Sequence, residues 1–121
     1  MSIVLLIDDS ATQLHVREAV LRNAGFSVQT ATTAGEALAR LREPDIAASL
    51  GVIVTDHVMP GPSGADFVRE LRRANSLVPV IVVSGMAEAE EEYLGLNVSF
   101  LHKPCPPEDL IRQVRSALEK R

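Results

Sequence analysis

Short apolar runs alternate with helix-like segments along this chain. Five apolar runs predict β-strands, each bounded by polar or turn-forming residues: 3–7, 26–31, 52–55, 79–84 and 98–102. The first, third and fourth runs contain almost no polar residue, which is typical of strands buried on both faces of a parallel sheet. The second run alternates polar and apolar residues and predicts a less buried strand.

The first segment between strands has the spacing of an amphipathic helix. Ser10 or Thr12 is its predicted cap, and Gly25 ends it. Its apolar face is predicted to contain four residues: Val16, Ala19, Val20 and Ala24.

Three further helices are expected over residues 33–42, 63–74 and 106–118. Thr33 and Glu36 match a capping box, and Ser63 caps the next helix. The charged residues after Ser63 are predicted to face water: Asp66, Arg69, Glu70, Arg72 and Arg73. Residues 45–50 fit either a loop or an extra helical turn, and residues 87–94 form a short acidic helix at best.

The regular alternation of strand and helix predicts the fold class. It favours an α/β protein with a parallel sheet, helices on both faces and right-handed crossovers. Five units in 121 residues are too few for a closed eight-stranded barrel. We therefore expect a flavodoxin-like three-layer α/β/α sandwich with strand order 2-1-3-4-5, forming a single domain over residues 1–121.

Composition narrows the class of protein. The chain is 46% hydrophobic, which fits a globular domain with a real core. Its net charge of −4 argues against direct nucleic-acid binding on electrostatic grounds. The single cysteine, Cys105, excludes an internal disulfide and fits a reducing compartment. The run at 3–7 is too short to span a membrane and has no signal-peptide features, so we predict a cytoplasmic protein without membrane insertion.

Polar side chains end four of the predicted strands, where continuous apolar runs give no structural reason for them. These residues are Asp8, Asp9, Asp56, Ser84 and Lys103. In the expected topology the strand order reverses between the first and third strands, and ligands bind beyond the carboxyl ends of the strands at that point. We therefore expect the five side chains to converge on one edge of the sheet.

Three clustered carboxylates repel one another unless a cation joins them. Mg²⁺ prefers oxygen ligands and usually binds one or two carboxylates together with phosphate oxygens. A backbone carbonyl in the turn after Asp56 completes the predicted ligand set. A carboxylate beside Mg²⁺ can attack phosphorus and form an acyl phosphate. That reaction needs positive charge and a hydrogen-bond donor near the transferred oxygens, which Lys103 and Ser84 supply.

In this order the motifs resemble the receiver domain of two-component response regulators, and the resemblance covers the whole chain. The matching features are Asp8-Asp9 after an apolar strand, Asp56 followed by Met59-Pro60-Gly61 and Gly64, Ser84-Gly85, and Lys103-Pro104. Each motif alone is common, whereas their order at successive strand ends is specific.

The resemblance implies a phosphorelay function with Mg²⁺ as cofactor. Asp56 would accept a phosphoryl group from the phosphohistidine of a sensor histidine kinase or a phosphotransfer protein. Asp9 would bind Mg²⁺ directly, Asp8 would bind it through water, and the carbonyl of Val58 would be a further ligand. No organic cofactor is expected, and the downstream protein target stays open.

The resemblance also implies a conformational switch. Ser84 and Lys103 would bind the phosphoryl oxygens, Phe100 matches the family's aromatic switch position, and the Lys103-Pro104 peptide bond would be cis. Ser84 and Lys103 are 19 residues apart, a few fewer than is usual in the family, and the missing residues fall in the fourth helix. The output surface therefore stays open; we expect a monomer or a weak phosphorylation-dependent dimer.

Structural interpretations compete with these roles. Asp8 and Asp9 are also good helix caps, and Ser84 fits a hydroxyl bonded to backbone. Phe100 fits half-buried packing as well as a switch. The position of His57 next to Asp56 suggests a metal-ligand or phosphohistidine role. Strand alternation turns the His57 side chain away from Asp56, so we predict a surface or packing role. His15 and His102 receive the same interpretation.

Two other functions fit parts of the pattern. A Mg²⁺-dependent phosphohydrolase with an aspartate nucleophile resembles this chemistry, but haloacid-dehalogenase-type enzymes carry a second Asp where this chain has Val58. A phosphorylation-independent binding module would not need the intact polar set. We therefore predict a phospho-acceptor signalling switch that catalyses only its own phosphorylation and dephosphorylation and is not otherwise an enzyme.

Overall fold

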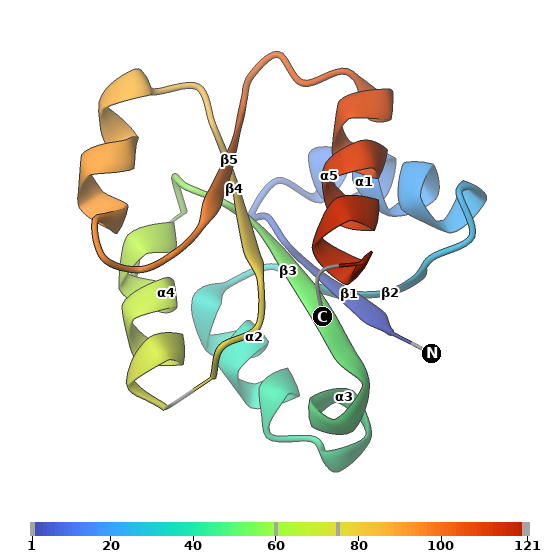
Figure 1. Ribbon diagram of the computed structural model, residues 1–121, viewed down its shortest axis with the longest axis horizontal. Coiled ribbons are helices and arrows are strands. Elements are labelled where there is room, and N and C mark those ends of the chain that lie inside the picture. Colours follow the sequence, from blue (N-terminus) through green and yellow to red (C-terminus); the bar gives the residue numbers. More distant parts are fainter. Residues whose placement is uncertain (1, 60, 75, 120–121) are drawn as a thin grey trace.

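A computed structural model describes residues 2–59, 61–74 and 76–119, so Pro60 of the predicted Met-Pro-Gly turn lies outside the described residues. The strands are β1 (Ile3–Ile7), β2 (Ser27–Ala31), β3 (Leu50–Asp56), β4 (Val80–Ser84) and β5 (Ser99–His102). They form one parallel five-stranded sheet in the order β2-β1-β3-β4-β5 (Figure 1). The predicted fold class and strand order are confirmed.

The helices form the two outer layers. They are α1 (Ala11–Asn23), α2 (Ala34–Leu41), α3 (Pro44–Ser49), α4 (Gly64–Arg73), the 3₁₀ helix η1 (Ala87–Tyr93) and α5 (Pro107–Glu119). α1 and α5 lie on one side of the sheet, whereas α2, α4 and η1 lie on the other (Figure 1). Ser10, Thr33 and Ser63 cap α1, α2 and α4 through their side-chain oxygens, as the sequence predicts.

Side chains along the buried strands point alternately into two hydrophobic clusters. Leu5, Ile53 and Val82 join the cluster beneath α2 and α4. Val4, Val54 and Val83 join the cluster beneath α1 and α5, which includes Leu110 and Val114 of α5. Because both faces are covered, β1, β3 and β4 can be apolar at nearly every position. Helices thus pack against both faces of the sheet, and the polar residues lie beyond the carboxyl ends of its strands.

The apolar face predicted for α1 is wrong in part. Val16 is 55% exposed and Ala19 is also exposed, whereas Leu14 and Leu21 are buried. Arg17 lies between those two leucines on the inward side, and its guanidinium reaches Asp8. A cation therefore interrupts the apolar stripe of α1, which obscures the periodicity in the sequence.

The two segments left unsettled by the sequence both contain helix. Residues 44–49 form α3, which supports the extra helical turn rather than a loop. Residues 87–93 form the 3₁₀ helix η1 in place of a full α-helix, ahead of β5. The short spacing between β4 and β5 is therefore accommodated by a tighter and shorter helix beside α4.

Candidate functional site

The carboxyl ends of adjacent strands bring the predicted polar residues together. Ile7, which precedes Asp8, pairs with Thr55 of β3, and Asp56 pairs with Val83 of β4. Ser84 in turn pairs with His102, the residue before Lys103. This register places residues from four separate sequence regions on one edge, as the topology requires.

An acidic cluster forms the centre of this edge. Asp8, Asp9 and Asp56 each offer a carboxylate oxygen, and these oxygens lie within 4.8 Å of one another. Asp8 is 1% exposed and Asp56 is 5% exposed, whereas Asp9 is open to solvent. Three aspartate oxygens at this separation, with one open side, fit the ligand preferences of a hard divalent cation that retains water.

Two cations neutralise part of this charge. The Nζ atom of Lys103 lies 2.9 Å from Oδ1 of Asp56, which confirms that the lysine reaches the predicted acceptor. Arg17, which the sequence did not suggest, places Nη1 2.7 Å from Oδ2 of Asp8. The other oxygen of Asp8 accepts a hydrogen bond of 2.9 Å from the backbone N–H of Ser10.

Burial raises the pKa of Asp8 above its ordinary value, and the negative charge of Asp56 adds to this effect. The backbone bond from Ser10, Arg17 and Lys103 oppose the rise in pKa. Neighbouring donors and cations thus offset part of the cost of burying the Asp8 side chain.

Ser84 is buried at the end of β4, and its hydroxyl bonds within its own loop. The hydroxyl accepts a hydrogen bond of 3.0 Å from the backbone N–H of Met86 and donates one of 3.3 Å to the Met86 carbonyl. The interpretation of Ser84 as a backbone-bonded hydroxyl is therefore confirmed in this structure. The backbone N–H of Lys103 donates to the Ser84 carbonyl at 2.9 Å, which ties the two residues together.

Val58 and Phe100 occupy the positions expected of them. Val58 lies in the turn after β3 and is 61% exposed. The role of its carbonyl as a metal ligand stays a prediction. Phe100 lies on β5 and is half-buried, in edge-to-face contact with Tyr93 at 5.3 Å between ring centroids. The packing role of Phe100 is confirmed, and its switch role stays a prediction. The Lys103-Pro104 peptide bond is cis, as expected.

His57 is more deeply engaged than the sequence suggested. It is 5% exposed, so the packing interpretation holds and the surface interpretation is wrong. Its ring nitrogens contact Tyr93 and Glu92, two residues of η1. The only signal in the sequence was the position of His57 next to Asp56. It did not identify the partners of His57, because Tyr93 and Glu92 lie far along the chain. His15 and His102 are both exposed.

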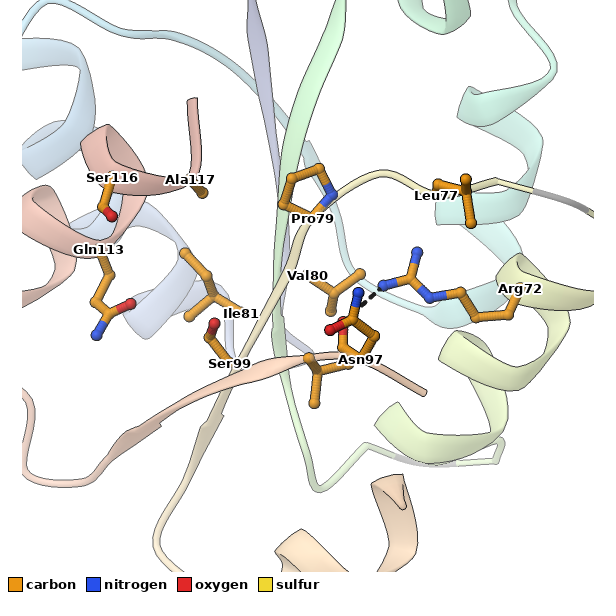
Figure 2. A pocket seen from close by; sticks show the side chains of 11 residues that line it. Arg72, Leu77, Pro79, Val80, Ile81, Asn97, Ser99, Gln113, Ser116 and Ala117 are labelled. Atoms are coloured by element: carbon orange, nitrogen blue, oxygen red, sulfur yellow. Dashed lines mark hydrogen bonds between the residues drawn. The ribbon is translucent and has the colours of Figure 1, made fainter. Parts of the chain in front are cut away.

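A cavity at the opposite edge of the sheet lacks comparable chemistry. It has a volume of about 250 Å³ and lies between the starts of β4 and β5, α5 and the end of α4 (Figure 2). Arg72 borders it and donates to the carbonyl of Asn97 at 3.0 Å (Figure 2). The guanidinium also donates to the carbonyls of Leu96, Ser76 and Val78. Arg72 therefore joins two loops, and the prediction that it faces water is wrong.

The family of the chain follows from comparison with known proteins. The family model for the response regulator receiver domain matches residues 4–115. This chain is a receiver domain. Protein PilH of Pseudomonas aeruginosa is 31% identical to this receiver domain over 125 residues, which cover 98% of each chain. The solved structure of the chemotaxis protein CheY4 of Vibrio cholerae has 29% identity and a TM-score of 0.86, covering 98% of this chain and 99% of that one.

Longer regulators contain a similar domain. The DNA-binding response regulator MtrA of Mycobacterium tuberculosis is 30% identical over 122 residues, which cover 97% of this receiver domain and 50% of MtrA. The receiver domain thus spans about half the length of the MtrA relatives.

Membership of the family settles the class of function. Receiver domains are phospho-accepting switches of two-component systems, they use a divalent metal, and their partners are histidine kinases or phosphotransfer proteins. The acidic cluster of this receiver domain is compatible with that use of metal. Among the helices in the described residues, none is long and apolar enough to cross a membrane.

Proposed function

We propose that Asp56 is the phosphoryl acceptor and that its phosphorylation changes a partner-binding surface. The observation that carries the proposal is the position of Asp56 at the centre of the site. Its carboxylate is grouped with those of Asp8 and Asp9 and lies 2.9 Å from the Lys103 ammonium. The Lys103 ammonium beside the Asp56 carboxylate can stabilise negative charge on a phosphoryl group as that carboxylate attacks it.

The residues that would hold Mg²⁺ are Asp9 and Asp56 directly, Asp8 through water, and the Val58 carbonyl. The separation of the three carboxylate oxygens and the exposure of Asp9 support this assignment. When bound, Mg²⁺ supplies positive charge to the phosphoryl oxygens during transfer. Both oxygens of Asp8 already accept hydrogen bonds from protein groups, which favours an indirect role for this residue.

The transfer itself uses groups of this chain. A carboxylate oxygen of Asp56 forms a bond to phosphorus while the bond from phosphorus to the donor's histidine nitrogen breaks, and that imidazole keeps the electron pair. Lys103 stays beside the acceptor and stabilises the charge on the phosphoryl oxygens. Ser84 gives up its bond to the Met86 carbonyl and donates to a phosphoryl oxygen instead. The new hydrogen bond to the phosphoryl oxygen is charge-assisted and therefore stronger than the bond to the Met86 carbonyl. This difference favours the moved position of Ser84.

The phosphoryl donor docks on α1 beside this site. Val16 is exposed there and borders a cavity of about 220 Å³ that is also lined by Lys103, Cys105 and Pro107. An apolar surface next to the acceptor suits a helix of a histidine kinase or phosphotransfer protein. Val16→Asp should slow transfer from such a donor protein without slowing labelling by a small phosphoryl donor.

Intact-mass spectrometry after incubation with acetyl phosphate and Mg²⁺ tests the proposal. The wild-type protein should gain one phosphoryl group, whereas Asp56→Asn and wild type treated with a chelator should gain none. Absence of label on the wild type would refute the proposal and favour a phosphorylation-independent module. Many turnovers of a small phosphate ester would instead favour a phosphohydrolase, since we propose a domain that catalyses only its own phosphorylation and dephosphorylation.

A further inference from the structure

The sole tyrosine of the chain lies between the acceptor strand and β5. Tyr93 ends η1 and is 3% exposed. Its ring makes an edge contact with His57 at 5.5 Å and another with Phe100 at 5.3 Å between centroids. His57 directly follows Asp56, and Phe100 is the aromatic residue of β5. Tyr93 therefore contacts both the residue that follows the acceptor and the strand that carries the proposed switch.

Hydrogen bonds fasten the end of η1 to His57. The Tyr93 hydroxyl lies 2.8 Å from Nδ1 of His57, and Oε2 of Glu92 lies 3.2 Å from Nε2. In a neutral imidazole one nitrogen donates and the other accepts. When Nε2 of a neutral His57 donates to Glu92, Nδ1 accepts from the Tyr93 hydroxyl. The backbone N–H of His57 donates to the Val83 carbonyl at 3.1 Å, which fixes the histidine to β4 as well.

Gly64 creates the space that the Tyr93 hydroxyl occupies. A Cβ atom at position 64 would lie 2.5 Å from that hydroxyl and 2.8 Å from the backbone oxygen of Asp56. The backbone N–H of Gly64 also donates to the His57 carbonyl at 2.9 Å. The hydroxyl is thus packed near the main chain of the acceptor strand, where any larger residue at position 64 would displace it.

The other end of η1 is linked to Ser84. Met86 is the residue before η1, and both its N–H and its carbonyl bond to the Ser84 hydroxyl. When Ser84 moves toward the phosphoryl group, these bonds must break or Met86 must follow. The beginning of η1 is then released or pulled, while Tyr93 at its end stays bonded to His57.

We infer that Tyr93 is a positioning residue that couples phosphorylation of Asp56 to the positions of η1 and Phe100. This inference rests on the proposed acceptor role of Asp56. With its hydroxyl fixed at His57, the Tyr93 ring turns together with η1 when Ser84 moves, and the Phe100 ring follows because it packs against the Tyr93 ring. Two discrete arrangements of a packed element are what a switch requires.

Tyr93→Phe tests the coupling because it removes the hydroxyl and keeps the ring. The response to measure is the change in amide hydrogen exchange over residues 85–98 on adding Mg²⁺ and beryllofluoride, a phosphoryl mimic. Acetyl phosphate labelling of each variant, measured by mass, shows separately whether Asp56 still reacts. We expect Tyr93→Phe to be labelled like the wild type and to lose more than half of the exchange response.

A second variant keeps the test independent of the stability of Tyr93→Phe. His57→Phe removes the same hydrogen bond from the other side and should lose the exchange response equally; the double variant should lose no more than either single one. Arg73→Gln is the matched control. It breaks the ion pair between Arg73 and Glu70 on α4, two residues whose side chains are 76% and 55% exposed, and should respond like the wild type.

The outcomes separate this inference from the proposed function. Normal labelling with a lost response in Tyr93→Phe and His57→Phe supports the coupling. Normal labelling with a wild-type response in both variants overturns it and leaves Asp56 as acceptor. Failure of the wild type to be labelled overturns both.

Discussion

Replacing Arg17 by Met tests whether its guanidinium balances the charge of the acidic cluster. Asp8 is 1% exposed and Arg17 is 16% exposed, with 2.7 Å between their charged atoms. Removing one partner of a buried ion pair costs about 3–5 kcal/mol because the other charge stays buried. The remaining bond from Ser10 and the partial exposure of Arg17 reduce that cost. We therefore expect Arg17→Met to lower the free energy of unfolding by about 2 kcal/mol without metal.

Mg²⁺ should remove most of this loss. The metal would place positive charge on the same three carboxylates, so a variant without Arg17 gains more from binding it. If Mg²⁺ recovers about 1.4 kcal/mol more stability in Arg17→Met than in the wild type, the variant binds the metal roughly tenfold more tightly. We therefore predict that Arg17 stabilises the metal-free domain and lowers its affinity for Mg²⁺.

Urea unfolding followed by circular dichroism, with chelator or with saturating Mg²⁺, measures both effects. The midpoint of Arg17→Met should fall by about 1 M urea in chelator and return close to that of the wild type in Mg²⁺. Arg112→Met is a suitable control, since Arg112 pairs with Asp109 at 3.0 Å on the exposed side of α5. A loss that is equal with and without Mg²⁺, or no larger than in the control, would refute the role of Arg17.

Three further predictions follow from the same contacts. Lys103→Ala removes the cation 2.9 Å from Asp56; its acetyl phosphate labelling rate should fall about 100-fold with the fold retained, and a near-normal rate would count against the lysine. Gly64→Ala should lower the free energy of unfolding by about 1–3 kcal/mol through overpacking against Tyr93; an unchanged urea midpoint would contradict this. Burial raises the pKa of Tyr93, with the charges of Glu92 and Asp56 adding to the rise, so its absorbance as tyrosinate should appear only well above the ordinary pKa of a phenol. Because the pKa is higher in the folded state, the associated stability is present below the unfolded pKa and is lost as pH rises above it; titration of the folded protein at the ordinary pKa would contradict the burial argument.

The strands and the acidic cluster could be predicted because each depends on a strong local signal. Residues such as Val54 and Val82 are buried whichever helix covers them, so their runs stay apolar. Asp56 at a strand end carries a similar signal, since an unpaired carboxylate is costly inside a sheet. Parallel topology then brings the strand ends together without any further information.

Arg17 and Tyr93 could not be predicted, for two different physical reasons. A charged residue in a helix is by default solvated, and the sequence does not show that Arg17 replaces an apolar residue on the inward side of α1. Tyr93 bonds to a histidine 36 residues away, and the contact depends on the exact path of a 3₁₀ helix. Local periodicity carries no information about such a long-range contact.

The central claim is that Asp56 is the residue that carries the phosphoryl group. Borohydride reduction of the protein after acetyl phosphate treatment, followed by peptide mass spectrometry, locates the acyl phosphate because only that carboxylate is reduced. The account predicts modification at Asp56 alone, with none in Asp56→Asn. Modification at Asp8 or Asp9 in the wild type, or a stable phosphoryl group on His57, would contradict it.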